Sequence, residues 1–356
     1  MHLTLFVPDL LWPDIDEATA FDFLGAADLA RFLTLSASTR STLHVTDSWE
    51  SRLAALFGFP QQHAPLAALR ALGANLPANG LQLCSDPVNL DFMQQALVLS
   101  PITAESLNDS DITALLQTLN DEFSGEGHFV AHHQGNDCHW TFVPEADHGA
   151  LPDLAACSRL AGRRVDADET RALLGRDGLR WINRIQMCLN QHPVNIARET
   201  QGLPVINSLW PWGLGTLDII PAARFTSVQG QTALLAGLCQ ATQTPHTSNS
   251  TFPHSAGQHL VAEPRLAGAI SHNDLDAWQS TLSGLISNWI SPALAALTNG
   301  QVPLQSLTLI SPNAHHEHRW TLQRSSKGLR GTFLQRWLGR TPRTPDLHAL
   351  VRAWSH

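Results

Sequence analysis

The sequence predicts an α/β protein whose sheet domain is interrupted by a smaller inserted α+β domain. Expected strands alternate with helices at both ends of the chain, and a mixed block of strands and helices lies between them. The length of 356 residues suits two domains, or one large domain with an insertion. Only 15% of the residues are charged, against about 25% in typical soluble domains, which favours a folded globule over a disordered chain.

The N-terminal part begins with an apolar run that ends at a carboxylate. Residues 3–7 suit a buried β-strand, and Asp9 follows at its carboxyl end. Residues 26–35 and 50–57 have the apolar spacing of helices. These segments are expected to form the first part of the sheet domain.

The middle of the chain is expected to form the inserted domain. The expected elements are strands 81–83 and 96–99 around a turn at Ser85-Asp86-Pro87, a helix over 109–123 with Asp109 or Ser110 as N-cap, hairpin strands 129–130 and 139–143 across Gly135-Asn136, and a helix over 177–191 that stops at His192-Pro193. Arg198 then begins a further turn, and residues 207–215 are expected to form a loop.

The C-terminal part returns to alternating strands and helices. Strands are expected near 225–228 and 259–262, with a helix over 230–241 between them. A long amphipathic helix carries Trp278 and Leu294, and a strand over 307–310 follows it. This alternation is typical of a sheet with covering helices.

Composition excludes several kinds of chemistry. Lys327 is the single lysine and is followed by Gly-Leu, so no P-loop is present, and without tyrosine no tyrosyl group takes part in catalysis. A formal net charge of −9 disfavours nucleic-acid binding. The 18 histidines indicate either metal chemistry or a compositional bias that also exchanges lysine for arginine.

The cysteines and the apolar segments bear on the compartment. Five scattered cysteines without a C-x-x-C pair are typical of reduced thiols. Neither a signal peptide nor an apolar run of about 18 residues is evident, so we expect a cytoplasmic protein without a membrane span.

The most distinctive stretch is LNQHPVNIARETQGLPVINSLWPWGLG, residues 189–215. It resembles the domain junction of the archaeal-type cofactor-independent phosphoglycerate mutases of the alkaline-phosphatase superfamily, in which H-P-V-N-x-x-R precedes N-x-I-W-x-W-G-x-G. The D-P-V-x-L segment at 86–90 and the L-N-x-x-F segment at 119–123 are similar to a proteobacterial branch described as RpfE-type regulatory proteins. The resemblance covers roughly residues 1–320.

This resemblance implies an alkaline-phosphatase-like three-layer sandwich with an inserted smaller α+β domain. The implied phosphatase-like domain has two parts, residues 1–78 and 201–324. The inserted domain lies between them at 79–200, and a basic extension follows at 325–356.

Mutases of this superfamily hold two divalent metals with Asp and His and use a Ser nucleophile. Asp9 matches the first metal ligand, and a one-residue gap places Ser48 at the nucleophile position, which Trp49 otherwise occupies. Other ligand positions depart from the pattern. Arg265 stands where a metal-binding Asp is expected, and Ala269 stands where a His is expected.

The last ligand cluster is altered as well, since Asn313 and Ala314 replace its Asp and His. The two-metal centre is therefore expected to be absent or crippled. The alternative is a rebuilt site for Mn, Zn or Mg. Its candidate ligands are Asp9, His272, Asp274, His315 and His316.

Substrate contacts are also implied by the resemblance. Arg198 and Arg180 could meet an anionic ligand, or pair locally with Glu199 and Asp177. The candidate substrate-binding set is Arg198, Arg180, Asn207, Trp210 and Trp212.

Three functions follow. The first is a phosphoglycerate-mutase-like protein that binds or regulates without catalysis, with a phosphorylated small molecule as ligand. The second is an active metal-dependent phosphomutase or phosphomonoesterase that uses Ser48. The third is an interaction module, because residues 319–356 carry eight basic side chains and one acidic one. That tail could bind a protein partner or a second copy, or form a solvated face.

Overall fold

A computed structural model describes the chain over residues 1–12, 26–44, 47–93, 96–134, 137–146, 148–299, 302–324 and Leu347. It divides into two compact units. The first unit comprises residues 1–43, 223–231 and 244–356, and the second comprises residues 44–222 and 232–243. The predicted division into four segments remains a prediction, and its basic extension lies outside the described residues except for Leu347. Within the described ranges, no helix is long and apolar enough to cross a membrane.

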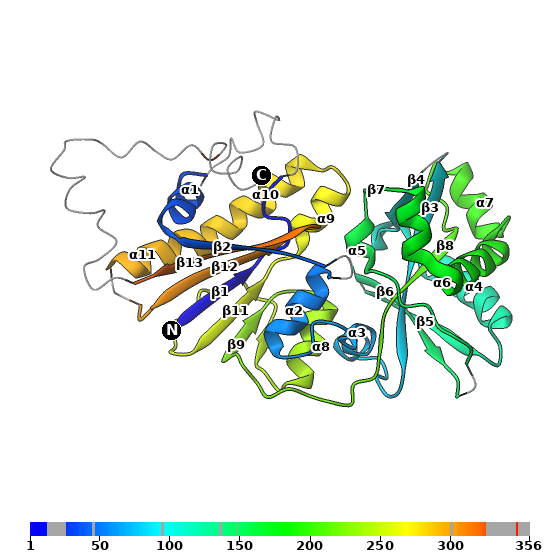
Figure 1. Ribbon diagram of the computed structural model, residues 1–356, viewed down its shortest axis with the longest axis horizontal. Helices are drawn as coiled ribbons and strands as arrows, with labels where there is room; N and C mark the ends of the chain where they lie inside the picture. The colour runs from blue at the N-terminus through cyan, green and yellow to red at the C-terminus, as the bar shows by residue number, and fades with distance from the viewer. Residues whose placement is uncertain are drawn as a thin grey trace. The chain divides into compact units, whose positions relative to one another are not determined.

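The first unit contains a seven-stranded sheet in the order β10-β9-β11-β1-β12-β13-β2 (Figure 1). The strands are β1 (His2–Phe6), β2 (Ala37–Thr42), β9 (Ser227–Gln229), β10 (His246–Thr247), β11 (Gln258–Ala262), β12 (Ser306–Pro312) and β13 (His316–Gln323). β1 runs parallel to both β11 and β12, whereas β13 is antiparallel to β12 and to β2. The strands predicted at both ends of the chain are thus confirmed.

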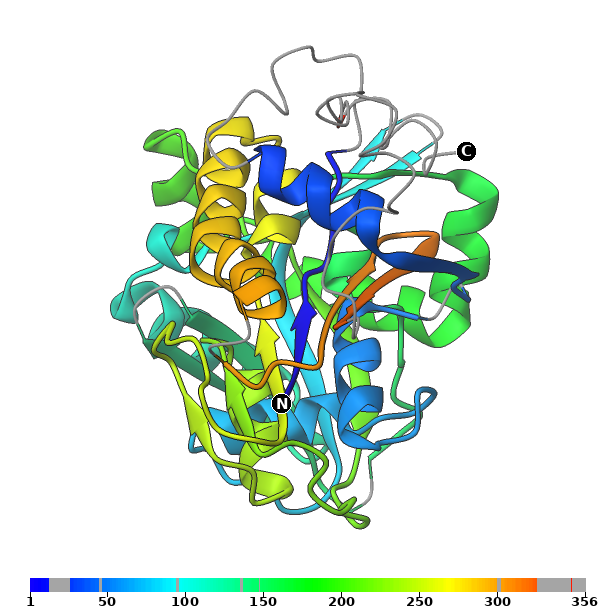
Figure 2. The same cartoon turned by 90° about the vertical axis from the view of Figure 1, so that its left-hand side faces the viewer.

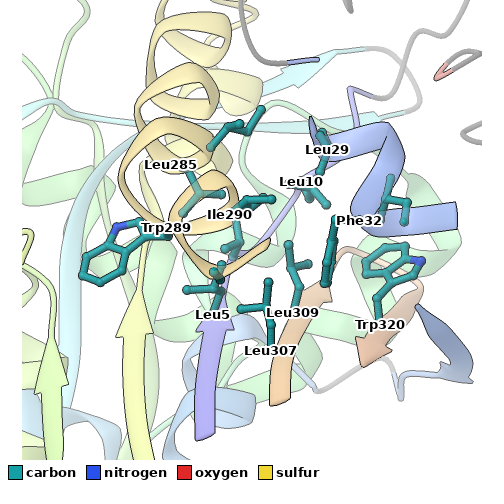
Figure 3. Packing of buried hydrophobic residues seen from close by; sticks show 14 of the residues in the cluster. Leu5, Leu10, Leu29, Phe32, Leu285, Trp289, Ile290, Leu307, Leu309 and Trp320 are labelled. Atoms are coloured by element: carbon teal, nitrogen blue, oxygen red, sulfur yellow. The ribbon is translucent and has the colours of Figure 1, made fainter. Parts of the chain in front are cut away.

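Helices cover one face of this sheet, as Figure 2 shows for the yellow and orange helices beside the dark-blue first strand. They are α1 (Ala26–Leu35), α9 (Arg265–Ser271), α10 (Leu275–Leu285), the π-helix η2 (Ile286–Ile290) and α11 (Ser291–Asn299). Their apolar side chains meet Leu5, Leu307 and Leu309 of the sheet in one buried cluster (Figure 3). Burying such side chains is the main source of stability in a layered α/β unit.

The second unit contains a six-stranded sheet in which β5-β6-β3-β4-β7 are consecutive and β8 pairs with β3. The strands are β3 (Gln82–Met93), β4 (Ala96–Pro101), β5 (Gly127–Gln134), β6 (Asp137–Pro144), β7 (Arg164–Asp166) and β8 (Ser208–Gly215). Its helices are α2 (Trp49–Phe57), α3 (Leu66–Gly73), η1 (Ala104–Ser106), α4 (Asp109–Glu122), α5 (Cys157–Leu160), α6 (Ala167–Leu189), α7 (Pro193–Thr200) and α8 (Ala233–Ala241).

The turn predicted at Ser85-Asp86-Pro87 is wrong, because β3 continues through these residues. On one side β3 pairs with β6 only through Leu83 and Cys84, and with β4 only from Val88 onward. On the other side β8 pairs with Ser85, Asp86 and Pro87 themselves. Pro87 therefore lies where β3 changes partners, a position at which a missing backbone N–H costs no hydrogen bond on that side.

The loop predicted over 207–215 is also wrong, since β8 forms there and pairs with β3. The helix predicted to stop at His192-Pro193 is α6, which ends at Leu189, and His192-Pro193 begins the next helix. His192 is the N-cap of α7, its Nδ1 accepts a hydrogen bond from the N–H of Val194 at 3.2 Å, and Pro193 takes the first helical position. The N-cap of α4 is Asn108, immediately before the predicted candidates.

Two glycines bring α3 and α8 into backbone contact. A Cβ built on Gly73 would lie 1.8 Å from the carbonyl oxygen of Ala233, and one built on Gly237 would lie 1.7 Å from that of Leu69. Both positions therefore exclude every residue larger than glycine unless the helices move apart.

Candidate functional site

Asp9, the first predicted metal ligand, lies at the carboxyl end of β1 in the first unit. Its backbone is in the left-handed region, with φ of 53°. Its N–H donates to the carbonyl of Pro312 at 3.0 Å, and the next N–H, that of Leu10, donates to Oγ of Ser311 at 3.1 Å. The residue after β1 is thus fixed beside the end of β12, the sheet edge at which α/β folds place ligands.

His272 and Asp274 lie at the junction of α9 and α10. His272 is the C-cap of α9, and its Nδ1 lies 2.8 Å from the carbonyl oxygen of Gly268. Asp274 is the N-cap of α10 and accepts a hydrogen bond from the N–H of Ala277 at 2.9 Å. Both side chains thus make the contacts of ordinary helix ends.

Asn313 organises the turn between β12 and β13. Its Oδ1 accepts hydrogen bonds from the N–H groups of His315 and His316, each at 2.8 Å. His316, a candidate ligand, and His318 both belong to β13, because β12 and β13 pair up to Pro312 and Glu317. An amide that already accepts two backbone hydrogen bonds has a structural role here.

His316 and His318 are kept neutral by their surroundings. Burial and the charge of Arg40 lower the pKa of His316, and they lower that of His318 to about 4. Neutral imidazole is the form that ligates metals. Even so, within the described ranges no group of three or more His, Cys, Asp or Glu side chains is arranged to hold a metal ion. The described residues, taken by themselves, do not converge as a two-metal centre requires.

Arg265 occupies a position where the resemblance implies a metal-binding Asp, at the carboxyl end of β11. Its guanidinium forms a bidentate pair with Glu263, with Nε–Oε1 and Nη2–Oε2 distances of 2.7 and 2.5 Å. This pairing raises the pKa of Arg265. The permanent cation at this position repels a divalent ion and also occupies the nearest carboxylate.

Ser48, the predicted nucleophile, is the N-cap of α2 in the second unit. Ser48 and Ser51 form a capping box, in which Oγ of Ser48 accepts from the N–H of Ser51 at 3.3 Å and Oγ of Ser51 accepts from the N–H of Ser48 at 3.0 Å. Both side chains are buried.

Glu50 lies beside this cap and is 6% exposed. Ser158 donates to its Oε2 at 2.8 Å, and its carboxyl group also bonds to the side chain of Ser48. Burial raises the pKa of Glu50 to about 7, although both hydrogen bonds act in the opposite direction. The first turn of α2 therefore holds a carboxyl group that titrates near neutrality.

Ser48 and Ser51 line a cavity of about 290 Å³ in the second unit. Its walls come from the first turn of α2, the segment before α3, the segment before α5, and β8. The lining residues are Ser48, Ser51, Gln61, Gln62, His63, Ala64, Leu66, Asp153, Leu154, Ala156, Trp212 and Gly213.

A buried ion pair lies behind Trp212. Nη1 of Arg70 is 2.8 Å from Oδ2 of Asp86, and Nε1 of Trp212 donates to the same oxygen at 2.8 Å. The guanidinium carbon of Arg70 is also 5.2 Å from the centre of the Trp212 ring, and its Nη2 donates to the carbonyl of Trp140 at 2.9 Å. The guanidinium of Arg70 is thus paired inside the protein.

The other predicted substrate contacts are occupied by backbone groups. Arg198 is 1% exposed and donates to the carbonyls of Pro204 and Ser106 at 2.9 and 2.6 Å. Asn207 exchanges two 2.8 Å hydrogen bonds with the backbone of Leu90.

Trp210 and Arg180 differ in their surroundings. Trp210 is fully buried, and its Nε1 donates to the carbonyl of Ala155 at 2.8 Å. Arg180 is exposed and lines a separate cavity of about 160 Å³ that Asp177 also lines. Of the predicted substrate and nucleophile residues, the structure thus brings together Ser48 and Trp212 at the larger cavity. The assigned roles remain predictions.

The sequence already places Glu50 two positions after Ser48, where the resemblance has the Asp of the nucleophile motif. Sequence reasoning missed Arg70 and Asp153. These two residues carried no signal, because they reach the site only through the packing of α3 and of the segment before α5.

Comparisons with known proteins identify a fold. No protein-family profile matches the chain, and no curated protein matches its sequence. The PH0037 protein from Pyrococcus horikoshii aligns with a TM-score of 0.50 and 12% identity, over 90% of this chain and 87% of that chain. A cofactor-independent phosphoglycerate mutase from Thermoplasma acidophilum DSM 1728 aligns with a TM-score of 0.38 and 14% identity, over 90% and 89% of the two chains. The likeness to PH0037 shows that the two chains share a fold.

Proposed function

We propose that the chain is a phosphoglycerate-mutase-like protein with an alkaline-phosphatase-type architecture that binds or regulates without catalysing phosphoryl transfer. The proposal begins from the motif at 189–215 and its resemblance to that family. The contacts of this motif give it a structural role within the second unit. Asn195 bonds to the carbonyls of Leu189 and Ile206, and Arg198 bonds to those of Pro204 and Ser106.

The ion pair between Arg265 and Glu263 is the observation that carries the non-catalytic part of the proposal. Metal-assisted phosphoryl transfer needs carboxylates and imidazoles that converge on the ions. At this position the chain presents a guanidinium, which cannot ligate a metal and keeps its charge at any ordinary pH. Asn313 adds support, because its Oδ1 accepts two backbone hydrogen bonds of the turn.

Metal content and turnover test this proposal together. The purified chain would be incubated with Mn, Zn or Mg, dialysed, and measured by plasma mass spectrometry. It would also be assayed for isomerisation of monophosphoglycerate and for hydrolysis of a phosphomonoester. We expect well under one ion per chain and no turnover above background. Two tightly held ions that are lost in Asp9→Asn, or metal-dependent turnover, would overturn the proposal.

A second candidate is an active metal-dependent phosphomutase or phosphomonoesterase. The position of Ser48 favours it, because this hydroxyl lies at the N-terminus of α2, lines the cavity and bonds to Glu50. Turnover that disappears in Ser48→Ala, while that variant keeps a cooperative unfolding transition, would support this candidate. Intact turnover in the variant would exclude Ser48 as the nucleophile.

A further inference from the structure

We propose that the cavity beside α2 binds a small uncharged molecule rich in hydroxyl or amide groups, and that it selects against phosphorylated forms of the same molecule. The proposal deepens the binding role argued above and rests on it. Four features of the cavity carry it, namely its size, its hydrogen-bonding groups, the charges of its described lining residues and its balance of partial charges.

The size of the cavity suits a small ligand. About 290 Å³ lies at the lower end of the range for small-molecule sites. Leu66, Leu154 and Ala156 supply apolar wall, together with Trp212 of β8. Half of the described lining residues are polar, which leaves this cavity richer in polar groups than most small-molecule sites.

The polar groups of the cavity both donate and accept hydrogen bonds. Gln62 and His63 are exposed, and within the described part of the chain their side chains hold no hydrogen bond. Nε2 of Gln61 donates to Asp47 at 2.9 Å, which leaves its Oε1 as an acceptor. An amide, an imidazole and an amide oxygen of this kind match hydroxyl groups, which also act in both directions.

The charges of the described lining residues argue against an anionic ligand. Neither arginine nor lysine is among the described residues that line the cavity. Arg70, whose guanidinium lies over the Trp212 ring, is paired with Asp86 at 2.8 Å. Phosphate recognition relies on such cations. A phosphate would instead meet Asp153, which lines the cavity and would repel it.

The surroundings of Asp153 also weaken the case for a cationic ligand. Burial raises the pKa of Asp153 and so disfavours its charged form. The N–H groups of Leu214, at 3.2 Å, and Gly213 and the charge of His63 act in the opposite direction, and they offset part of any negative charge that Asp153 carries. The N-terminus of α2, with its partial positive charge, opens on the same cavity through Ser48 and Ser51. The weakly negative Asp153 and the weakly positive N-terminus of α2 together favour a neutral ligand that contacts both.

Matched probes test the charge preference. Isothermal titration of the full chain would compare glucose, glucose 6-phosphate and glucosamine, and then other neutral monosaccharides and polyols with their phosphorylated and amino analogues, each up to about 10 mM. We expect at least one neutral member to bind, and its phosphorylated analogue to bind about tenfold more weakly or not at all. Tighter binding of phosphorylated members, or no binding by any neutral member, would overturn the proposal.

Variants locate the site. Gln62→Ala and His63→Ala should each weaken binding of the neutral probe about tenfold, the value of one or two lost hydrogen bonds. Gln117→Ala, at an exposed position on α4, serves as the control and should leave binding unchanged. Equal binding by all three variants would place the ligand elsewhere. The same preparation is also tested for metal content and turnover, so the two proposals can fail separately. A metal-free, inactive chain that binds no neutral probe would overturn only the ligand proposal. A chain that binds the neutral probe but shows metal-dependent turnover would overturn only the non-catalytic proposal.

Discussion

At the scale of single residues, Glu50 lies at the first turn of α2 with its carboxyl group buried and bonded to Ser158 and Ser48. Its pKa rises from an ordinary 4.5 to about 7 because burial disfavours the charged form. The folded chain therefore holds this proton over a pH range in which the unfolded chain releases it. By linkage, the contribution of Glu50 to stability falls as pH rises from about 4.5 to 7, by about 3 kcal/mol in total.

We predict that Glu50→Gln removes this dependence. The free energy of unfolding of the wild type, minus that of the variant, should decrease steadily between about pH 4.5 and 7, because only the wild type bears the penalty for ionisation. Urea titrations at several pH values measure it. Glu199→Gln, at an exposed site on α7, is the control and should follow the wild type. A difference between wild type and Glu50→Gln that is constant across the window would contradict the prediction.

The residues of the cavity show how far sequence reasoning reaches at this scale. Ser48 could be singled out because it precedes a helix and matches a motif position. Asp153 and Arg70 could not, because neither lies in a motif, and each meets the site through contacts that depend on tertiary packing. Arg265 was identified from the sequence, but its pairing with Glu263 is visible only in the structure.

At the scale of elements, the close approach of α3 and α8 depends on Gly73 and Gly237. We predict that Gly237→Ala destabilises the second unit by several kcal/mol, because its Cβ would lie 1.7 Å from the carbonyl oxygen of Leu69 and that backbone cannot yield cheaply. Gly268→Ala in α9 is the matched control. A Cβ there has no neighbour within 4 Å, so alanine should be neutral or stabilise by up to about 1 kcal/mol through helix propensity.

Urea unfolding of both variants checks the prediction. Equal midpoints for Gly237→Ala and the wild type would show that α3 and α8 do not pack as described.

The same scale explains which elements could be predicted. Helices such as α1 and α8 carry apolar periodicity or a run of apolar residues, and their positions were anticipated within a few residues. β3 and β8 were misread because Asp86-Pro87 and Trp210-Pro211-Trp212 carry strong turn signals. Pairing between the two strands overrides these signals, since Asp86 lies opposite Trp210 and Pro87 lies opposite Leu209. Local propensity yields to a tertiary partner in both segments.

At the scale of the whole molecule, pairs of neighbouring strands differ in how far apart they lie in the sequence. β5 and β6 form a local hairpin, with Gln134 opposite Asp137. β1 lies between β11 and β12, and His2 and Ser306, which also share a 2.9 Å hydrogen bond, are 304 positions apart. β1 therefore pairs in this sheet with strands that lie far along the sequence, since Gln258 and Ser306 are the residues opposite His2.

We predict that this difference sets the order of refolding. Closing a long loop costs more conformational entropy than closing a short one, so strand pairs with distant partners form late. During refolding from urea, pulse-labelling hydrogen exchange with mass spectrometry should show amides of β5 and β6 protected before those of β1. The amides of α4, a local element, provide an internal reference for early protection. Protection of β1 at the same time as β5, or before it, would mean that collapse of the apolar cluster around Leu5 and Leu309 precedes local pairing, and the entropic argument would fail.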